Sequence, residues 1–366
     1  MIKNDILKIF YLGIFFRTIV IISLLLFPIY HEIFGYIQPF KYYEKGDLYL
    51  YNELSKYNFS NLIQFISQLF YASFTTLDPS QKVPGFILII IFKIIEYSND
   101  NYFLFCLLVL LLEVISFYIW LIIFNKFFDK IFLVLFTFIP FSYIYFIFPS
   151  IDSFVYFFFT IIIYCIINLL ISNQKNELRL FIILFLFLFL KAESLLILLP
   201  ILIIYFFKRE KFNLKMIYSY GYVLLFVIGI IYYYPYYLHE YNTVITRNNN
   251  SLDFTNFFLD PSTEIINYIN FYIIKFLKIF GFINVSYSNN LLIISVRHFM
   301  SFFYIFGFFF SLIFYKNNKL FSFIIFMNTI VILFFLFPSI RYIINYTPLY
   351  LFFIFIFLKK KLLKIL

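Results

Sequence analysis

Three charged residues stand where their side chains could act on a hydroxyl or a phosphate. Asp47, in a Gly-Asp-Leu-Tyr stretch, has a carboxylate that can take a proton from an incoming hydroxyl, unless it is an ordinary solvated acid. Lys82 precedes Pro84 at the start of an apolar run, where a lysine and a helix N-terminus can hold a phosphate together. The alternative is a lysine that snorkels at a membrane boundary. Arg341 begins another apolar run, and its planar guanidinium suits bidentate phosphate binding or simply marks an interface.

Other charges interrupt apolar runs and also require an explanation, because a charge at a bilayer centre costs about 3 kcal/mol. Lys191 and Glu193 lie in a Lys-Ala-Glu-Ser break, where they either neutralise each other or face a substrate at the mouth of a cavity. Glu113 lies in the middle of a run and is predicted to make a helix–helix contact rather than to be catalytic. Asp152 is predicted to cap the start of a helix.

The composition indicates a membrane protein. The 366 residues are 64% hydrophobic and 13% charged, with 61 Phe and 34 Tyr. Average soluble chains carry roughly 25% charged residues, and disordered chains contain few apolar residues, so the composition fits neither class. The net charge of +10 comes from short cationic clusters between apolar runs, a pattern of membrane topology and not of nucleic-acid binding.

Metal and disulfide chemistry has little support in the sequence. The two cysteines, Cys106 and Cys165, lie inside apolar runs, and the three histidines are scattered. Neither a disulfide framework nor a cysteine-based metal site is expected. No acidic cluster demands a divalent ion, so we expect no cofactor, although dependence on a divalent metal stays open.

The apolar runs predict an all-α, polytopic membrane protein with about 9–11 transmembrane helices in a single domain, 1–366. Two stretches between runs are unusually long for connectors, 31–83 and 239–290, and functional loops often have this length. The predicted helical runs are 6–30, 84–97, 102–124, 131–148, 151–172, 180–207, 216–238, 291–315, 320–338 and 341–358.

The cationic clusters predict the orientation, because Lys and Arg beside spans stay on the cytoplasmic side. With the clusters in the cytoplasm, both termini are cytoplasmic and both long loops are external. This arrangement also requires 84–97 to dip without crossing and 180–207 to form a hairpin of two short helices that turns at Lys191–Ser194. The alternative for 180–207 is one long span with two buried charges. The clusters contain Lys3 and Lys8; Lys126 and Lys130; Lys175 and Arg179; Lys208, Arg209, Lys211 and Lys215; Lys316 and Lys319; and Lys359, Lys360, Lys361 and Lys364.

In this order the elements resemble the GT-C superfamily of integral membrane glycosyltransferases, especially those that use polyprenyl-phosphate sugars, such as protein mannosyltransferases and aminoarabinose transferases. The resemblance covers most of the chain as an architecture. It is carried by a first loop with an acid followed by tyrosine, and then by Lys82-Val83-Pro84-Gly85, Pro149-x-x-Asp152-Ser153, Lys191-Ala192-Glu193-Ser194 and a late Arg341-Tyr342 before Pro348.

The resemblance implies an enzyme of the cytoplasmic membrane that moves a sugar from a polyprenyl-phosphate donor to a glycan, lipid or protein acceptor on the external face. Asp47 matches the base that activates the acceptor. Lys82 and Arg341 match groups that bind the lipid phosphate, with Lys191 and Glu193 close to the substrate. The expected partners are this donor, the acceptor and membrane lipids, with no nucleic acid.

Two alternatives stay open. An O-antigen-type polymerase also acts on lipid-linked sugars in the membrane and would rely on external arginines, for which Arg247 and Arg297 are candidates. A transporter or flippase for lipid-linked sugars is a second alternative. Transporters often have internal repeats and helices broken by Gly or Pro. No convincing repeat is visible here, and the chain has 8 Gly.

Overall fold

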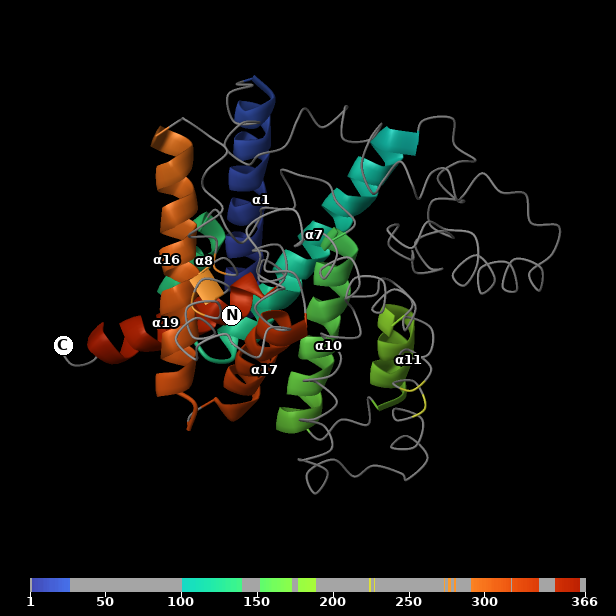
Figure 1. The fold of residues 1–366 in the computed structure, drawn as a ribbon. Helices are drawn as coiled ribbons and strands as arrows, with labels where there is room; N and C mark the ends of the chain where they lie inside the picture. Colours follow the sequence, from blue (N-terminus) through green and yellow to red (C-terminus); the bar gives the residue numbers. More distant parts are fainter. Residues whose placement is uncertain are drawn as a thin grey trace, which may run out of the picture.

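The described part of the protein is a bundle of α-helices in a computed structural model (Figure 1). No strand occurs among the described residues, which confirms the prediction of an all-α fold for this part of the chain. The structure describes residues 2–26, 101–139, 152–172, 177–188, 291–316, 318–335 and 346–362, with isolated positions between 224 and 280.

Three long helices form where the sequence predicts them. They are α1 (Ile2–Leu26), α7 (Asn101–Asn125) and α10 (Asp152–Ser172). Each consists mainly of apolar residues and has no internal proline, and α1 ends two residues before Pro28. The helix start predicted at Asp152 is confirmed, and the capping role of its side chain stays a prediction.

The helix after α7 is shorter than predicted. The apolar run 131–148 was expected to form one span, but α8 (Lys130–Phe138) has nine residues and a length of about 14 Å. Ile139 has an extended backbone, with φ −73° and ψ 118°, because it precedes Pro140 and the proline ring disfavours the helical conformation there. The prediction of one continuous helix over 131–148 is therefore wrong.

The remaining helices are α11 (Glu177–Leu188), α16 (Leu291–Ile313), α17 (Lys319–Phe335) and α19 (Thr347–Leu362). The last of these begins later than the predicted run 341–358. Tyr346 forms a turn before it, and Pro348 stands in its first turn, where the missing N–H costs nothing.

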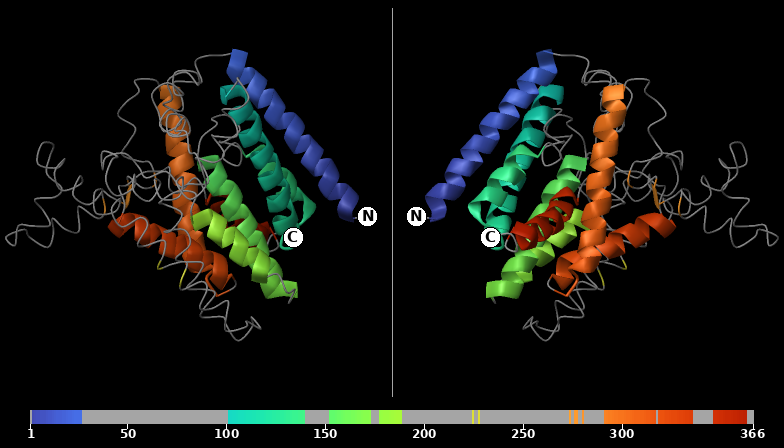
Figure 2. Two further views of the ribbon diagram at one scale, coloured as in Figure 1. Left: turned by 90° about the vertical axis from the view of Figure 1, so that its right-hand side faces the viewer. Right: turned by 90° about the vertical axis from the view of Figure 1, so that its left-hand side faces the viewer.

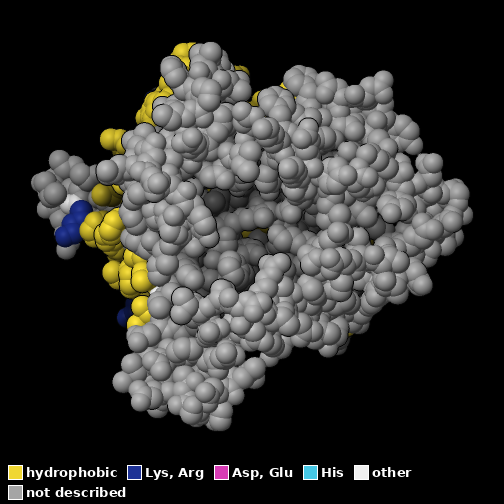
Figure 3. All heavy atoms as spheres, turned by 45° about the horizontal axis from the view of Figure 1, so that its top comes forward, with side chains coloured by type: hydrophobic (Ala, Val, Ile, Leu, Met, Phe, Trp, Pro, Cys, Tyr) yellow, Lys and Arg dark blue, Asp and Glu magenta, His cyan; other side chains and the backbone are white. Residues whose placement is uncertain are grey.

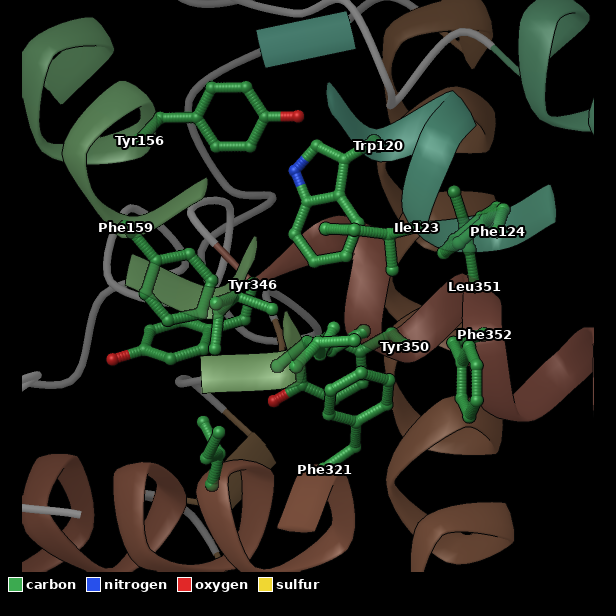
Figure 4. Packing of buried hydrophobic residues seen from close by; sticks show 14 of the residues in the cluster. Trp120, Ile123, Phe124, Tyr156, Phe159, Phe321, Tyr346, Tyr350, Leu351 and Phe352 are labelled. Atoms are coloured by element: carbon green, nitrogen blue, oxygen red, sulfur yellow. The ribbon is translucent and has the colours of Figure 1, made fainter. Parts of the chain in front are cut away.

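An aromatic core joins α7, α8, α17 and α19, and Figure 4 shows its residues from α7, α17 and α19 beside Tyr156 and Phe159 of α10. The Phe352 ring of α19 lies 4.7 Å from Phe321 of α17 and 5.1 Å from Phe128 of the α7–α8 turn, measured between ring centroids. Both pairs meet edge to face, the geometry that aromatic quadrupoles favour. Beside this core, the indole N–H of Trp120 donates to Thr160 Oγ1 over 2.9 Å, which ties α7 to α10 without leaving a buried donor unpaired.

Two glycines mark the closest helix approaches. A Cβ on Gly13 of α1 would lie 2.5 Å from the Phe117 ring of α7 and 2.6 Å from the Thr137 methyl of α8. A Cβ on Gly307 of α16 would lie 2.8 Å from the Tyr350 Cβ of α19. Helices in membranes use small residues in this way to bring backbones together. The sequence shows no motif of the GxxxG type from which these contacts could be predicted.

The outer faces of the helices are apolar as well as the inner ones. On α1, Tyr11, Phe15 and Ile19 are exposed, and on α7, Leu107 and Leu111 are exposed. A helix that is apolar on all sides is typical of a membrane span or a deeply buried core. Among the described residues one stretch, Leu107–Asn125, has the length and composition to cross a membrane, and shorter apolar helices lie in α10, α11, α16 and α17.

Candidate functional site

The five residues that the sequence predicts for the site are outside the described part of the chain. They are Asp47, Lys82, Lys191, Glu193 and Arg341. The long stretch 31–83 is also outside it, as is nearly all of 239–290. What the structure shows is where the helices that flank these segments begin and end.

Ion pairs define one end of the bundle, which we call the basic end. At this end Lys130 pairs with Asp5 of α1 over 3.1 Å, and Asp129 pairs with Lys359 of α19 over 3.3 Å. Lys126 also donates to Asn168 Oδ1 of α10 over 2.7 Å. Partial burial in this contact lowers the pKa of the Lys126 ammonium below its usual value.

The α16–α17 turn lies at the basic end too. The Lys360 ammonium of α19 lies 4.4 Å from the centre of the Phe314 ring. Phe314 stands two residues before Lys316 in the sequence. The structure thus brings together four of the cationic clusters that the sequence predicts on one side of a membrane: the N-terminal cluster, the 126–130 cluster, the 316–319 cluster and the C-terminal cluster.

The directions of the helices show which helix ends lie away from the basic end. The helices α1 and α8 run the same way, because Asp5 meets Lys130 and Phe16 meets Phe138 at 4.9 Å. Since α8 returns from the end of α7, Leu26 and the start of α7 lie at the end away from the lysines (Figure 2). We call this the distal end.

Three more helices can be oriented against α7. The contacts of Trp120 with Thr160 and of Lys126 with Asn168 show that α10 runs parallel to α7, so Asp152 is the end of α10 that is turned away from the lysines and lies beside the middle of α7. The helix α11 returns beside α10 and runs toward the distal side, and its last turn lies beside α10, with Phe187 at 6.4 Å from Phe158. The helix α16 ends at the basic end and therefore starts, at Leu291, at the distal end.

A buried pair of charged residues lies between α1 and α7. Arg17 is 0% exposed and Glu113 is 2% exposed, and the Arg17 charge acts on the Glu113 carboxyl. Arg17 Nη1 donates to the carbonyl oxygens of Gly13 (3.3 Å) and Thr137 (3.5 Å), and its guanidinium lies 3.6 Å from the centre of the Phe117 ring. These contacts compensate much of the cost of burying the cation.

Hydroxyl groups from other helices complete this buried polar cluster. Tyr156 of α10 interacts electrostatically with Glu113, Arg17 and Tyr304 of α16. The Tyr304 hydroxyl hydrogen-bonds to Thr347 Oγ1 of α19 over 2.8 Å. Five helices therefore contribute to one polar cluster inside an otherwise apolar bundle.

The buried polar cluster suits a structural role better than chemistry on a substrate. The Glu113 Oε1 atom is inaccessible and has no hydrogen-bond donor among the described residues. A buried carboxyl that no solvent reaches cannot meet a substrate hydroxyl in this arrangement, which agrees with the predicted helix–helix role of Glu113. Within the described ranges no group of three His, Cys, Asp or Glu side chains could hold a metal ion.

Arg17 is the residue that sequence reasoning missed. The N-terminal run was interpreted from its flanking lysines, Lys3 and Lys8, although Arg17 lies in the middle of that run. The signal was available, because an arginine within a span requires a partner. The matching signal in the next long helix was Glu113.

In comparisons with known proteins, no protein-family model, no curated protein and no solved structure matches the chain.

Proposed function

We propose that the chain is a multi-pass membrane glycosyltransferase with a GT-C-like architecture. In this proposal about 9–11 helices cross the cytoplasmic membrane, with the basic end in the cytoplasm and the distal end outside. The exposed apolar faces of α1, α7, α11 and α16 support this placement, since they would lie against lipid. The lysines of the basic end support the orientation.

One observation carries the proposal. It is the direction in which the chain leaves and enters the helices. Asp47 and Lys82 belong to the segment between Leu26 of α1 and Asn101 of α7, two helix ends at the distal end, and Lys191 and Glu193 follow α11, which runs toward the distal side. These directions support an active site that the two segments share on the distal side.

Arg341 is tied to the bundle through α19. It stands five residues before Tyr346, so at most about 18 Å of extended chain separates the two. Tyr346 is buried, with its ring 4.8 Å from Phe159 of α10. A phosphate-binding role for Arg341 therefore requires a site within about 18 Å of Tyr346.

The proposed reaction is a single displacement at the anomeric carbon of the sugar. Asp47 takes the proton of the acceptor hydroxyl, whose oxygen forms the new bond to carbon. The bond from that carbon to the lipid phosphate oxygen breaks, and the phosphate leaves with the electron pair. Lys82 and Arg341 offset the developing negative charge, which is commonly the largest electrostatic contribution to such catalysis. Lys191 and Glu193 contact the substrate, and the 239–290 segment covers the acceptor.

The test is a complementation experiment in the host. The gene is deleted and restored as wild type, as Asp47→Asn or as Asp129→Asn, a matched control at the basic end. Surface glycolipids are then compared on gels and by mass spectrometry. The proposal predicts loss of one sugar residue, with rescue by wild type and Asp129→Asn but not by Asp47→Asn.

Other outcomes would redirect the assignment. Collapse of a long glycan ladder to single repeats would indicate a lipid-linked oligosaccharide polymerase. Full rescue by Asp47→Asn would overturn the role of Asp47 as the base. An unchanged glycolipid profile in the deletion strain would contradict a role in glycan assembly.

A further inference from the structure

Four lysines form an uncompensated cationic patch at the basic end. Lys316 and Lys319 lie at the α16–α17 turn, and Lys360 and Lys361 lie near the end of α19, all four exposed. The Lys360 ammonium at 4.4 Å from the Phe314 ring joins the two groups. Among the described residues none of the four forms an ion pair, whereas Lys130 and Lys359 at the same end each pair with an aspartate. We call these four residues the lysine patch.

An apolar track on α16 leads to the lysine patch. Phe302, Phe306, Phe309 and Ile313 recur at intervals of three or four residues, so they share one face of the helix. All four are exposed, Phe306 by 53% and Ile313 by 68%. Figure 3 shows hydrophobic side chains along this flank of the molecule, with lysine side chains beside them.

The dimensions of the track match one lipid leaflet. From Phe302 to Ile313 the helix rises about 16 Å, close to half of the roughly 30 Å hydrocarbon core of a bilayer. Tyr315, 45% exposed, follows at the junction of the track and the patch, where aromatic residues with a polar tip are favoured in membranes. Apolar track, tyrosine and lysines thus follow one another in the order of acyl chain, interface and headgroup.

We propose that the lysine patch and this track form a binding site for an anionic phospholipid of the cytoplasmic leaflet. The headgroup phosphate would lie between the lysines of the two helix ends, and an acyl chain would lie along α16. Charge complementarity favours an anionic lipid over a zwitterionic one. The continuous apolar track favours a lipid over a soluble phosphate, which would use only the lysines. The site rests on the membrane placement and not on the transferase chemistry.

The experiment measures lipid binding to the purified full-length chain by native mass spectrometry, with phosphatidylglycerol as the probe and phosphatidylcholine as the comparison. The patch variant is Lys316→Gln/Lys360→Gln. The charge-matched control is Lys8→Gln/Lys126→Gln, which removes two exposed lysines from the same end of the bundle. Soluble glycerol phosphate distinguishes a headgroup-only site from a lipid site.

The proposal predicts that the patch variant binds phosphatidylglycerol on the order of tenfold more weakly while the control variant binds as wild type does. Phosphatidylcholine should bind weakly to all three proteins, and glycerol phosphate should not compete. An additional Ile313→Asn substitution should weaken binding while leaving the lysines in place. An equal loss in the patch and control variants, or no loss in either, would overturn the site. Asp47→Asn affects none of these readings, so the site and the transferase proposal fail separately.

Discussion

The buried Arg17 and Glu113 provide the sharpest test of the helix arrangement. Each side chain is almost fully buried, and the two come from different helices. Replacing Glu113 by Gln removes the carboxyl on which the Arg17 charge acts, and replacing Arg17 by Met removes that charge. The double variant removes both charges and leaves neither group uncompensated. A double-mutant cycle over these three variants isolates their coupling.

The structure sets the size of the expected effects. Removing one member of a contacting buried ion pair costs about 3–5 kcal/mol, because the other charge stays in the low-dielectric interior. Arg17 and Glu113 interact electrostatically without a direct hydrogen bond from Arg17 to Glu113 Oε1, and Arg17 keeps its contacts with Phe117 and two backbone carbonyls, so Glu113→Gln should cost less than this range. Arg17→Met removes those contacts as well and should cost more than Glu113→Gln. The double variant should cost at least about 0.5 kcal/mol less than the sum of the single variants.

The assay is equilibrium unfolding of the purified protein in mixed micelles of mild detergent and SDS. The free energies of unfolding of the wild type, both single variants and the double variant complete the cycle. Strictly additive losses would refute an electrostatic coupling between α1 and α7. A Glu113→Gln protein as stable as wild type would show that Arg17 needs no counter-charge, and the interpretation of the buried polar cluster would fail.

The same unfolding assay tests three further contacts. Gly13→Ala should lower the free energy of unfolding by about 1–3 kcal/mol because of overpacking, while Thr18→Ala on the exposed side of α1 should change it by less than about 0.5 kcal/mol. Trp120→Phe should cost about 0.5–1.5 kcal/mol because it removes the hydrogen bond to Thr160, whose hydroxyl keeps its own donation to the Tyr156 carbonyl, and a variant as stable as wild type would contradict the bond to Trp120. The largely exposed pair of Asp129 and Lys359 should show a coupling below about 1 kcal/mol in its own cycle, and this coupling should shrink in high salt.

The sequence predicts most helix positions in the described part of the chain, because long apolar runs without proline have few alternatives to a helix. The α7, α10 and α16 helices match their predicted runs within two residues at each end. The prediction failed at α8, because the apolar run continues past Pro140 whereas the helix ends at Phe138. Apolar character alone does not show where a helix stops, and backbone chemistry has to be considered with it.

The buried polar cluster was less predictable, because it depends on which helices meet. The sequence singles out Glu113 but offers no partner for it nearby, and Arg17 is 96 positions away. Only the packing of α1 on α7 brings their charges together. The contacts at Gly13 and Gly307 are equally hidden, since each depends on a single small residue facing a particular partner. The candidates Asp47, Lys82, Lys191, Glu193 and Arg341 stay predictions.

The central claim is that these candidate residues share one membrane face, opposite the lysines of the basic end. Single cysteines placed at Asp47, Lys191 and Arg341, and at Lys8 and Lys316, test it in intact cells after both native cysteines have been replaced. The account predicts that a membrane-impermeant maleimide labels the first three positions directly. The other two should be labelled only after permeabilisation. Labelling of Lys8 or Lys316 from outside, or a split of the first three positions between the two faces, would contradict the account.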